Sequence, residues 1–200
     1  MKNIDASFSN PAQSKSGLLV IADISGFTQF VRDTDLEMGQ SITQAFLQAI
    51  IDSNTLGLQI SEIEGDAVFF YKFGTPPTAE YILKQFEQML EAFHKNLQRI
   101  NHDREIPFEL ALKLIVHYGE MSEYQLMGFK KLYGQSVIEV HRLLKSSVKH
   151  TQYALLTDDY VKSSHSTLDN GGARRQCKIL KALRKLCYSY FSYQNSYVLS

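Results

Sequence analysis

Two long amphipathic segments alternate with short apolar runs in this chain, and their order restricts the possible folds more than any other feature. Apolar residues at three- and four-residue spacing predict helices, while continuous or alternating apolar runs predict strands. The helices are expected over about 36–53 and 76–100, and the strands over about 18–22, 57–64, 66–73 and 108–118. This order predicts an α+β fold, the ferredoxin-like βαββαβ arrangement with both helices on one face of an antiparallel sheet.

Further elements extend this unit toward the C-terminus. A hairpin partner is expected at about 121–129, a short helix at 135–147, a strand at 153–157, a polar loop at 163–172 and a closing strand over 188–199. The resulting organisation is a flexible leader at 1–16, one domain at 17–160 and a C-terminal extension of that domain at 161–200.

Composition excludes several classes of function. Lys and Arg total 21, as do Asp and Glu, so no global field attracts nucleic acid. No stretch reaches the roughly 18 apolar residues that a membrane span needs. The two cysteines, Cys177 and Cys187, are too few for a disulfide framework or a four-cysteine zinc site. We interpret them as ordinary thiols, and the chain as a cytoplasmic protein.

Two aspartates stand at places where a predicted apolar strand meets a turn. Asp23 follows the run Leu18–Ala22, and Asp66 follows Gly65 just before another apolar run. A carboxylate at such a place is costly unless it is hydrogen-bonded, exposed or neutralised by a cation. The pair predicts a metal-dependent phosphate site. The alternative is that both carboxylates only cap backbone N–H groups.

Four short motifs follow one another along the chain. They are Ala22-Asp23-Ile24-Ser25-Gly26-Phe27-Thr28, Glu64-Gly65-Asp66-Ala67, His117-Tyr118-Gly119-Glu120, and Gly134-Gln135-Ser136-Val137 leading to Arg142-Leu143. In this order they resemble the motifs of the class III adenylate and guanylate cyclase catalytic domain. The resemblance covers about residues 17–160. It implies a ferredoxin-like palm with added elements, in agreement with the element order above.

The resemblance implies a metal site and a phosphate-binding loop. Asp23 and Asp66 match the aspartates that hold two Mg²⁺ or Mn²⁺ ions, and the Ile24 carbonyl matches a backbone ligand of the metal. Two ions stabilise the attacking and leaving oxygens of an in-line displacement. The loop Ser25, Gly26, Phe27 and Thr28 matches the phosphate cradle, where Gly26 lets backbone N–H groups approach the phosphate oxygens.

The resemblance also implies a homodimer. Arg142 matches an arginine that reaches the site from the opposite subunit and stabilises charge on the transferring phosphate, a role that suits a planar, permanently charged guanidinium. Each of two equivalent sites would then take its aspartates from one chain and its arginine from the other.

Several positions depart from the family pattern. Ile138 stands where the family has an asparagine that orients the ribose. Glu62 stands at a base-selecting position and favours guanine, while Lys131 stands at its partner position and could instead pair with Glu62. The lysine that binds triphosphate has no clear match; Lys178 and Lys181 are candidates by composition only.

Two functional classes remain open. One is a cyclase that converts a purine nucleoside triphosphate, weakly, to a cyclic nucleotide and pyrophosphate; the other is a cyclase-fold nucleotide-binding or regulatory module without turnover. Arg142 could also be an ordinary surface arginine. His117 and His141 lack a third ligand at metal spacing, so we interpret them as satisfied or surface histidines. The basic segment 174–186 predicts a helix that is either solvated or in contact with an anionic partner.

Overall fold

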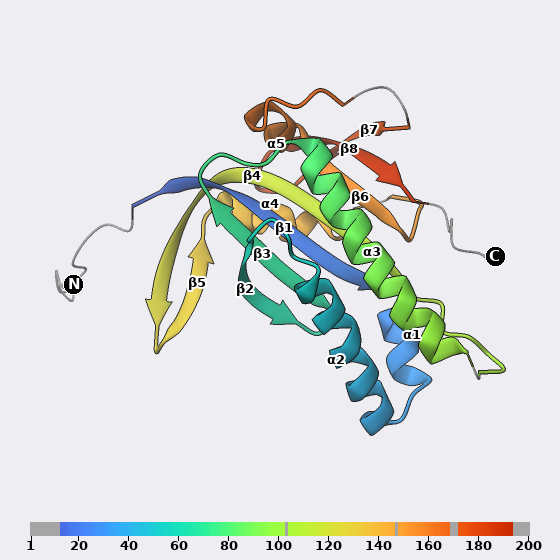
Figure 1. Ribbon diagram of the computed structural model, residues 1–200. Coiled ribbons are helices and arrows are strands. Elements are labelled where there is room, and N and C mark those ends of the chain that lie inside the picture. Colours follow the sequence, from blue (N-terminus) through green and yellow to red (C-terminus); the bar gives the residue numbers. More distant parts are fainter. Residues whose placement is uncertain (1–12, 103, 147, 169–171, 194–200) are drawn as a thin grey trace.

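The structure, a computed structural model, describes residues 13–102, 104–146, 148–168 and 172–193 (Figure 1). Its strands are β1 Lys15–Ser25, β2 Gln59–Glu64, β3 Ala67–Phe73, β4 Ala111–Leu126, β5 Phe129–Tyr133, β6 Tyr153–Thr157, β7 Arg174–Ile179 and β8 Lys185–Ser192. Its helices are α1 Phe27–Arg32, α2 Leu36–Asp52, α3 Ala79–Asn101, α4 Gln135–Leu143 and α5 Asp158–Ser163. None of the described helices is both long and apolar enough to cross a membrane.

One sheet organises the whole structure. Its strand order is β2-β3-β1-β4-β6-β8-β7, with β5 paired to β4 outside this path. The four strands β2, β3, β1 and β4 are antiparallel neighbours, which is the ferredoxin-like order that the sequence predicts. The added strand β6 runs parallel to β4, and β8 and β7 continue from it as antiparallel strands.

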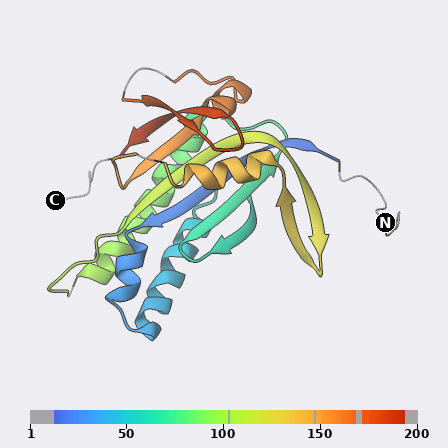
Figure 2. The same cartoon turned by 180° about the vertical axis from the view of Figure 1, so that it is seen from behind.

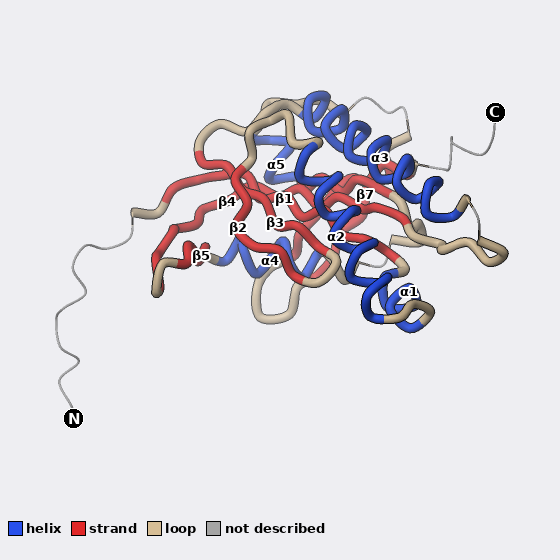
Figure 3. The backbone as a smooth tube through the Cα atoms, turned by 60° about the horizontal axis from the view of Figure 1, so that its bottom comes forward, coloured by secondary structure: helices blue, strands red, loops and turns tan. Residues whose placement is uncertain are grey.

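Helices α2 and α3 cover one face of the sheet, as predicted (Figures 1 and 3). Alternate residues of β1, including Leu18, Val20 and Ala22, point into this core. Phe46 of α2 stacks on Phe93 of α3 with ring centroids 4.6 Å apart. The short helix α1 was not expected, because the sequence from Ser25 to Thr28 indicates only a turn. Phe30 on α1 is buried against Phe108 at 4.9 Å, so tertiary packing stabilises this helix.

Helix α4 lies on the opposite face, seen in front of the strands in Figure 2. Its residues Val140 and Leu143 pack on Leu19 and Ile21, the alternate residues of β1. The helix ends at Leu143, four residues before the predicted end. The Ser146 amide and hydroxyl both donate to the Leu143 carbonyl, which stops the helix there.

Several further predicted boundaries move in the structure. The hairpin expected at 121–129 instead has β4 running unbroken to Leu126 and β5 returning from Phe129. Met127 and Gly128 make the turn with φ of 50° and 87°, which explains the glycine. Strand β1 begins at Lys15, inside the predicted leader, and residues 1–12 lie outside those described. The closing strand predicted over 188–199 is confirmed for 188–192, although β8 begins earlier, at Lys185, and residues 194–199 lie outside those described.

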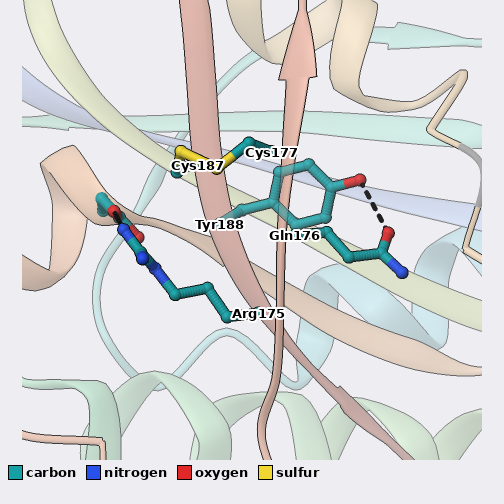
Figure 4. Close-up of a disulfide and its surroundings, with 6 residues drawn as sticks. Arg175, Gln176, Cys177, Cys187 and Tyr188 are labelled. Carbon is teal, nitrogen blue, oxygen red and sulfur yellow. Dashed lines mark hydrogen bonds and ion pairs between the residues drawn. A yellow bond between two sulfur atoms is a disulfide. The ribbon is translucent and has the colours of Figure 1, made fainter.

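The helix predicted over 174–186 is wrong, because this segment forms β7, a turn and the start of β8. Strand β6 leaves an edge that β8 occupies, and β7 then pairs with β8, so sheet contacts override helical periodicity. The thiol interpretation is also wrong. Cys177 and Cys187 face each other in register and form a disulfide (Figure 4). The cysteines therefore do not support a reducing compartment.

A buried carboxylate joins α4 to the sheet and to the β7–β8 turn. Glu139 is 1% exposed and accepts two hydrogen bonds from Arg184, of 2.7 and 2.9 Å. His117, fully buried, lies 3.1 Å from Glu139 through Nε2 and 3.0 Å from the Thr157 hydroxyl through Nδ1. Burial raises the pKa of Glu139, but the bonds from Arg184, His117 and Gln135 outweigh it and hold that pKa well below its ordinary value. His117 is thus a satisfied core histidine, as expected.

Replacing Arg184 by methionine should lower the free energy of unfolding at pH 7 by about 2–4 kcal/mol, because it leaves the Glu139 carboxylate buried without its main partner. The matched change Arg175→Met breaks an ion pair with Asp158 in which the arginine side chain is 65% exposed, and should cost less than about 1 kcal/mol. Urea unfolding measures both values.

The difference between wild type and Arg184→Met should also shrink in acid. A depressed pKa adds stability above the ordinary value of 4.5, and this contribution is lost as the pH falls toward the pKa in the folded state. Equal losses for the two arginine variants would contradict the assignment of Glu139 as the buried anchor.

Candidate functional site

Asp23 lies near the C-terminal end of β1, on the α4 face of the sheet. Its direct cross-strand partners are Ala67 on β3 and Lys113 on β4, and Lys113 in turn pairs with Tyr153 on β6. The Lys113 ammonium lies 2.8 Å from the Asp23 carboxylate, with the two side chains 18% and 15% exposed. Lys113 therefore supplies a cation to Asp23 within the chain itself.

Asp66 stands in the tight turn between β2 and β3, where Gly65 takes a φ of 57°. Its carbonyl accepts a 3.1 Å hydrogen bond from the Ile24 amide, so the backbones beside the two aspartates are tied together. Burial and the nearby charge of Asp23 raise the pKa of Asp66, although its own backbone and Lys113 oppose the shift. Two carboxylates thus lie at adjacent strand ends, and Lys113 lies on the strand at the other side of Asp23.

This donor set fits a hard divalent cation that arrives with a phosphate ligand. Mg²⁺ is commonly held by one or two carboxylates plus substrate phosphates, with water filling the remaining positions. In the described part of the chain, no group of three or more His, Cys, Asp or Glu residues is placed to hold a metal by itself. Asp23, Asp66 and the Ile24 backbone would therefore hold a cation as part of a metal-nucleotide complex.

The predicted phosphate loop leads from the end of β1 into α1. Gly26 has a φ of 88°, and a Cβ atom there would lie 2.4 Å from the Glu109 carbonyl oxygen. Both the left-handed backbone and the close approach therefore require glycine. Ser25 and Gly26 also line a groove of about 1220 Å³ between α1, the end of α3 and the segment 106–111. Thr28 is exposed, and Phe27 packs at 5.8 Å from Phe30.

Glu62 and Lys131 form an ion pair with 2.5 Å between Oε2 and Nζ. Glu62 lies at a bulge in β2, where the pairing with β3 shifts register, and Lys131 lies on β5. Hydrogen bonding to the Glu62 carboxylate raises the pKa of Lys131. The structure thus places together the two residues proposed to select the base, and pairs them with each other.

Arg142 lies on the exposed side of α4, and its guanidinium donates a hydrogen bond to the Lys181 carbonyl in the β7–β8 turn. Ile138, one turn earlier, is 49% exposed. Lys178 donates to the Lys145 carbonyl at 2.6 Å and to the Arg142 carbonyl at 3.4 Å. Within this chain, the predicted catalytic arginine is therefore held at the hairpin turn.

Sequence reasoning missed two residues beside Asp23. Lys113 and Tyr153 are its neighbours along one row of the sheet. Burial, then the charges of Asp23 and Tyr188, raises the pKa of Tyr153 to about 12. In the sequence, Lys113 is recognisable as a charged residue within an apolar strand. Only the strand register, however, reveals that it faces Asp23. Nothing comparable marks Tyr153, because a tyrosine at a strand start is ordinary core.

Comparison with known proteins identifies a family and one curated relative. Residues 43–153 match the family described as "Protein of unknown function (DUF2652)". The uncharacterized protein Rv2561/Rv2562 of Mycobacterium tuberculosis is 31% identical over 119 residues, which cover 56% of this chain. The match spans 55% of that protein's length.

Solved structures share the fold at low sequence identity. The guanylyl cyclase Cya2 superposes with a TM-score of 0.70 at 15% identity, over 94% of this chain and 98% of the other. The adenylyl cyclase CyaB from P. aeruginosa gives 0.65 at 16% identity, over 91% and 96% of the two chains. The chain belongs to the DUF2652 family of unknown function, and it has the fold of the adenylyl and guanylyl cyclase catalytic domains.

Proposed function

We propose that this protein binds a purine nucleoside triphosphate with divalent cations at the Asp23–Asp66 end of the sheet and converts it slowly to a cyclic nucleotide and pyrophosphate. One observation carries the proposal. Two carboxylates lie at adjacent strand ends, near enough for the charge of Asp23 to raise the pKa of Asp66. The shared fold with a guanylyl and an adenylyl cyclase supports the reaction class.

Each group at the site has a distinct role in this proposal. Asp23, Asp66 and the Ile24 carbonyl would hold Mg²⁺ or Mn²⁺, and a bound ion supplies charge to polarise the phosphate and activate the attacking hydroxyl. The backbone from Ser25 to Thr28 approaches the phosphates at Gly26. Once Lys131 leaves its ion pair with Glu62, the Glu62 carboxylate accepts hydrogen bonds from the N1–H and amino groups of guanine. This favours GTP over ATP.

Catalysis further needs a second copy of the chain. A two-fold homodimer would bring Arg142 of one copy to the aspartates of the other, where its guanidinium stabilises charge on the transferring phosphate. Arg142 must first leave the Lys181 carbonyl of its own chain. The resting contact therefore lowers the rate.

A second candidate function is a nucleotide-binding or regulatory module without turnover. Ile138 favours it, because an exposed apolar side chain replaces the amide that would orient the ribose. Its neighbours do not substitute for that amide. Gln135 donates to Glu139 at 2.8 Å, and the Ser136 hydroxyl donates to the Glu120 carbonyl at 2.7 Å.

Titration of the protein with GTP and Mn²⁺ in a calorimeter tests the site itself. Asp66→Asn should weaken Mn²⁺-dependent GTP binding by at least roughly tenfold, which is the size of effect that losing even an outer-shell partner produces. Asp52→Asn, at an exposed aspartate at the end of α2, is the matched control and should bind like wild type. Equal binding by all three proteins would refute a site at Asp66.

Asp66→Asn should also change how stability depends on pH. A raised pKa means that the folded protein gains stability from protonated Asp66 at low pH and loses it as the pH rises through that pKa. At pH 7 the asparagine variant should therefore be more stable than wild type by up to about 1 kcal/mol, since solvent screens a partly exposed carboxyl. This advantage should vanish near pH 3. Urea unfolding at both pH values measures it.

Ile138→Asn should raise turnover by at least about tenfold if the remaining groups are competent, because one missing donor typically costs about 10²- to 10³-fold. Product is followed as cyclic nucleotide and pyrophosphate from GTP with Mn²⁺. Leu36→Asn changes an exposed leucine at the start of α2 that has no proposed role at the site, and it should leave the rate unchanged. If wild type and Ile138→Asn both bind GTP and neither forms product, the second candidate function stands instead.

A further inference from the structure

The disulfide between Cys177 and Cys187 closes the hairpin at one edge of the sheet. The two residues are direct cross-strand partners, and their Cα atoms lie 3.9 Å apart. Figure 4 shows the bond linking the two strands beside Gln176 and Tyr188. Cys177 is exposed and Cys187 is partly exposed, so a thiol in solution can reach the bond.

Strand β7 is the last strand of the sheet. Among the described strands it pairs with β8 alone. Five of its six side chains are exposed, so it buries little apolar surface. Segments of this kind open locally at low free energy. The covalent bond is therefore a restraint on β7 in addition to its backbone pairing with β8 and the Arg175–Asp158 ion pair.

The same hairpin holds the end of α4. The Arg142 guanidinium donates to the Lys181 carbonyl in the turn, and Lys178 on β7 donates to the Lys145 carbonyl at 2.6 Å. Ala182 in this turn has a φ of 61°, unfavourable for a residue with a side chain. At the other end of the turn, Arg184 is anchored to buried Glu139. On the β7 side, the side chains are mostly exposed apart from buried Leu180.

We infer that the β7–β8 hairpin is a thiol-sensitive latch on Arg142 and the end of α4. A dithiol reductant opens it: one thiolate attacks a sulfur of the bond, and the second thiolate then resolves the mixed disulfide. Two protein thiols and one oxidised reductant result, after transfer of two electrons and two protons. Residues 174–183 then loosen and release Arg142, while Arg184 and Glu139 keep the domain folded. The latch goes beyond the proposed function, because it needs neither metal nor nucleotide.

Hydrogen exchange followed by mass spectrometry tests the latch on the whole chain, oxidised or treated with dithiothreitol. Reduction should speed exchange in 174–183 and 140–146 roughly tenfold, with no change in β1 and β3. The double variant Cys177→Ser, Cys187→Ser should exchange at the rate of the reduced protein, and dithiothreitol should not change that rate. Arg142→Gln should speed exchange in 140–146 even when oxidised, but leave 174–183 slow until reduction.

Thiol titration run in parallel decides between outcomes. Two thiols released by dithiothreitol, together with the local changes above, support the latch. Two free thiols already present after air oxidation would overturn it, and so would unchanged exchange after full reduction. Faster exchange throughout β1 and β3 would also overturn it, since the bond would then stabilise the entire domain. All these readouts are independent of GTP binding, so the latch and the proposed function can fail separately.

Discussion

The burial of Glu139 is the constraint on which the α4 side of the structure depends. A carboxylate that is 1% exposed is tolerated only if its hydrogen-bonding capacity is filled, and four donor groups from three parts of the chain fill it. Gln135 comes from α4 itself, His117 from β4 and Arg184 from the hairpin. One buried charge therefore fixes the helix, the central sheet and the C-terminal hairpin relative to one another.

The end of β1 shows the opposite balance of charge on the same face of the sheet. There, Lys113 pairs with Asp23, while burial and then the like charge of Asp23 raise the pKa of Asp66. A structural cluster such as that of Glu139 lowers the pKa of its acid. At Asp66 the shift has the opposite direction, because burial and the like charge of Asp23 outweigh the attraction of Lys113. This contrast separates the anchor from the candidate site.

The sequence predicted those helices and strands that local periodicity of apolar residues determines. The helix at 36–53 and the strand at 153–157 match α2 and β6 closely, and the order of elements predicted the ferredoxin-like sheet. It could not predict what depends on pairing across the sheet. Basic residues at 174–186 have helical spacing, yet β8 offers a partner that makes 174–179 a strand. The Cys177–Cys187 bond and the Lys113–Asp23 pair likewise follow from register between distant segments.

Helix α4 separates the residues that the fold requires from the residues to which the proposed function assigns a role. Glu139, Val140 and Leu143 point inward and hold the domain together, whereas Ile138 and Arg142 lie on the exposed side. Substitutions at exposed helix positions usually change stability by less than about 0.5 kcal/mol. The change Ile138→Asn should therefore carry little structural penalty. The fold constrains the inward side of α4, whereas the proposed function assigns roles to residues on its outward side.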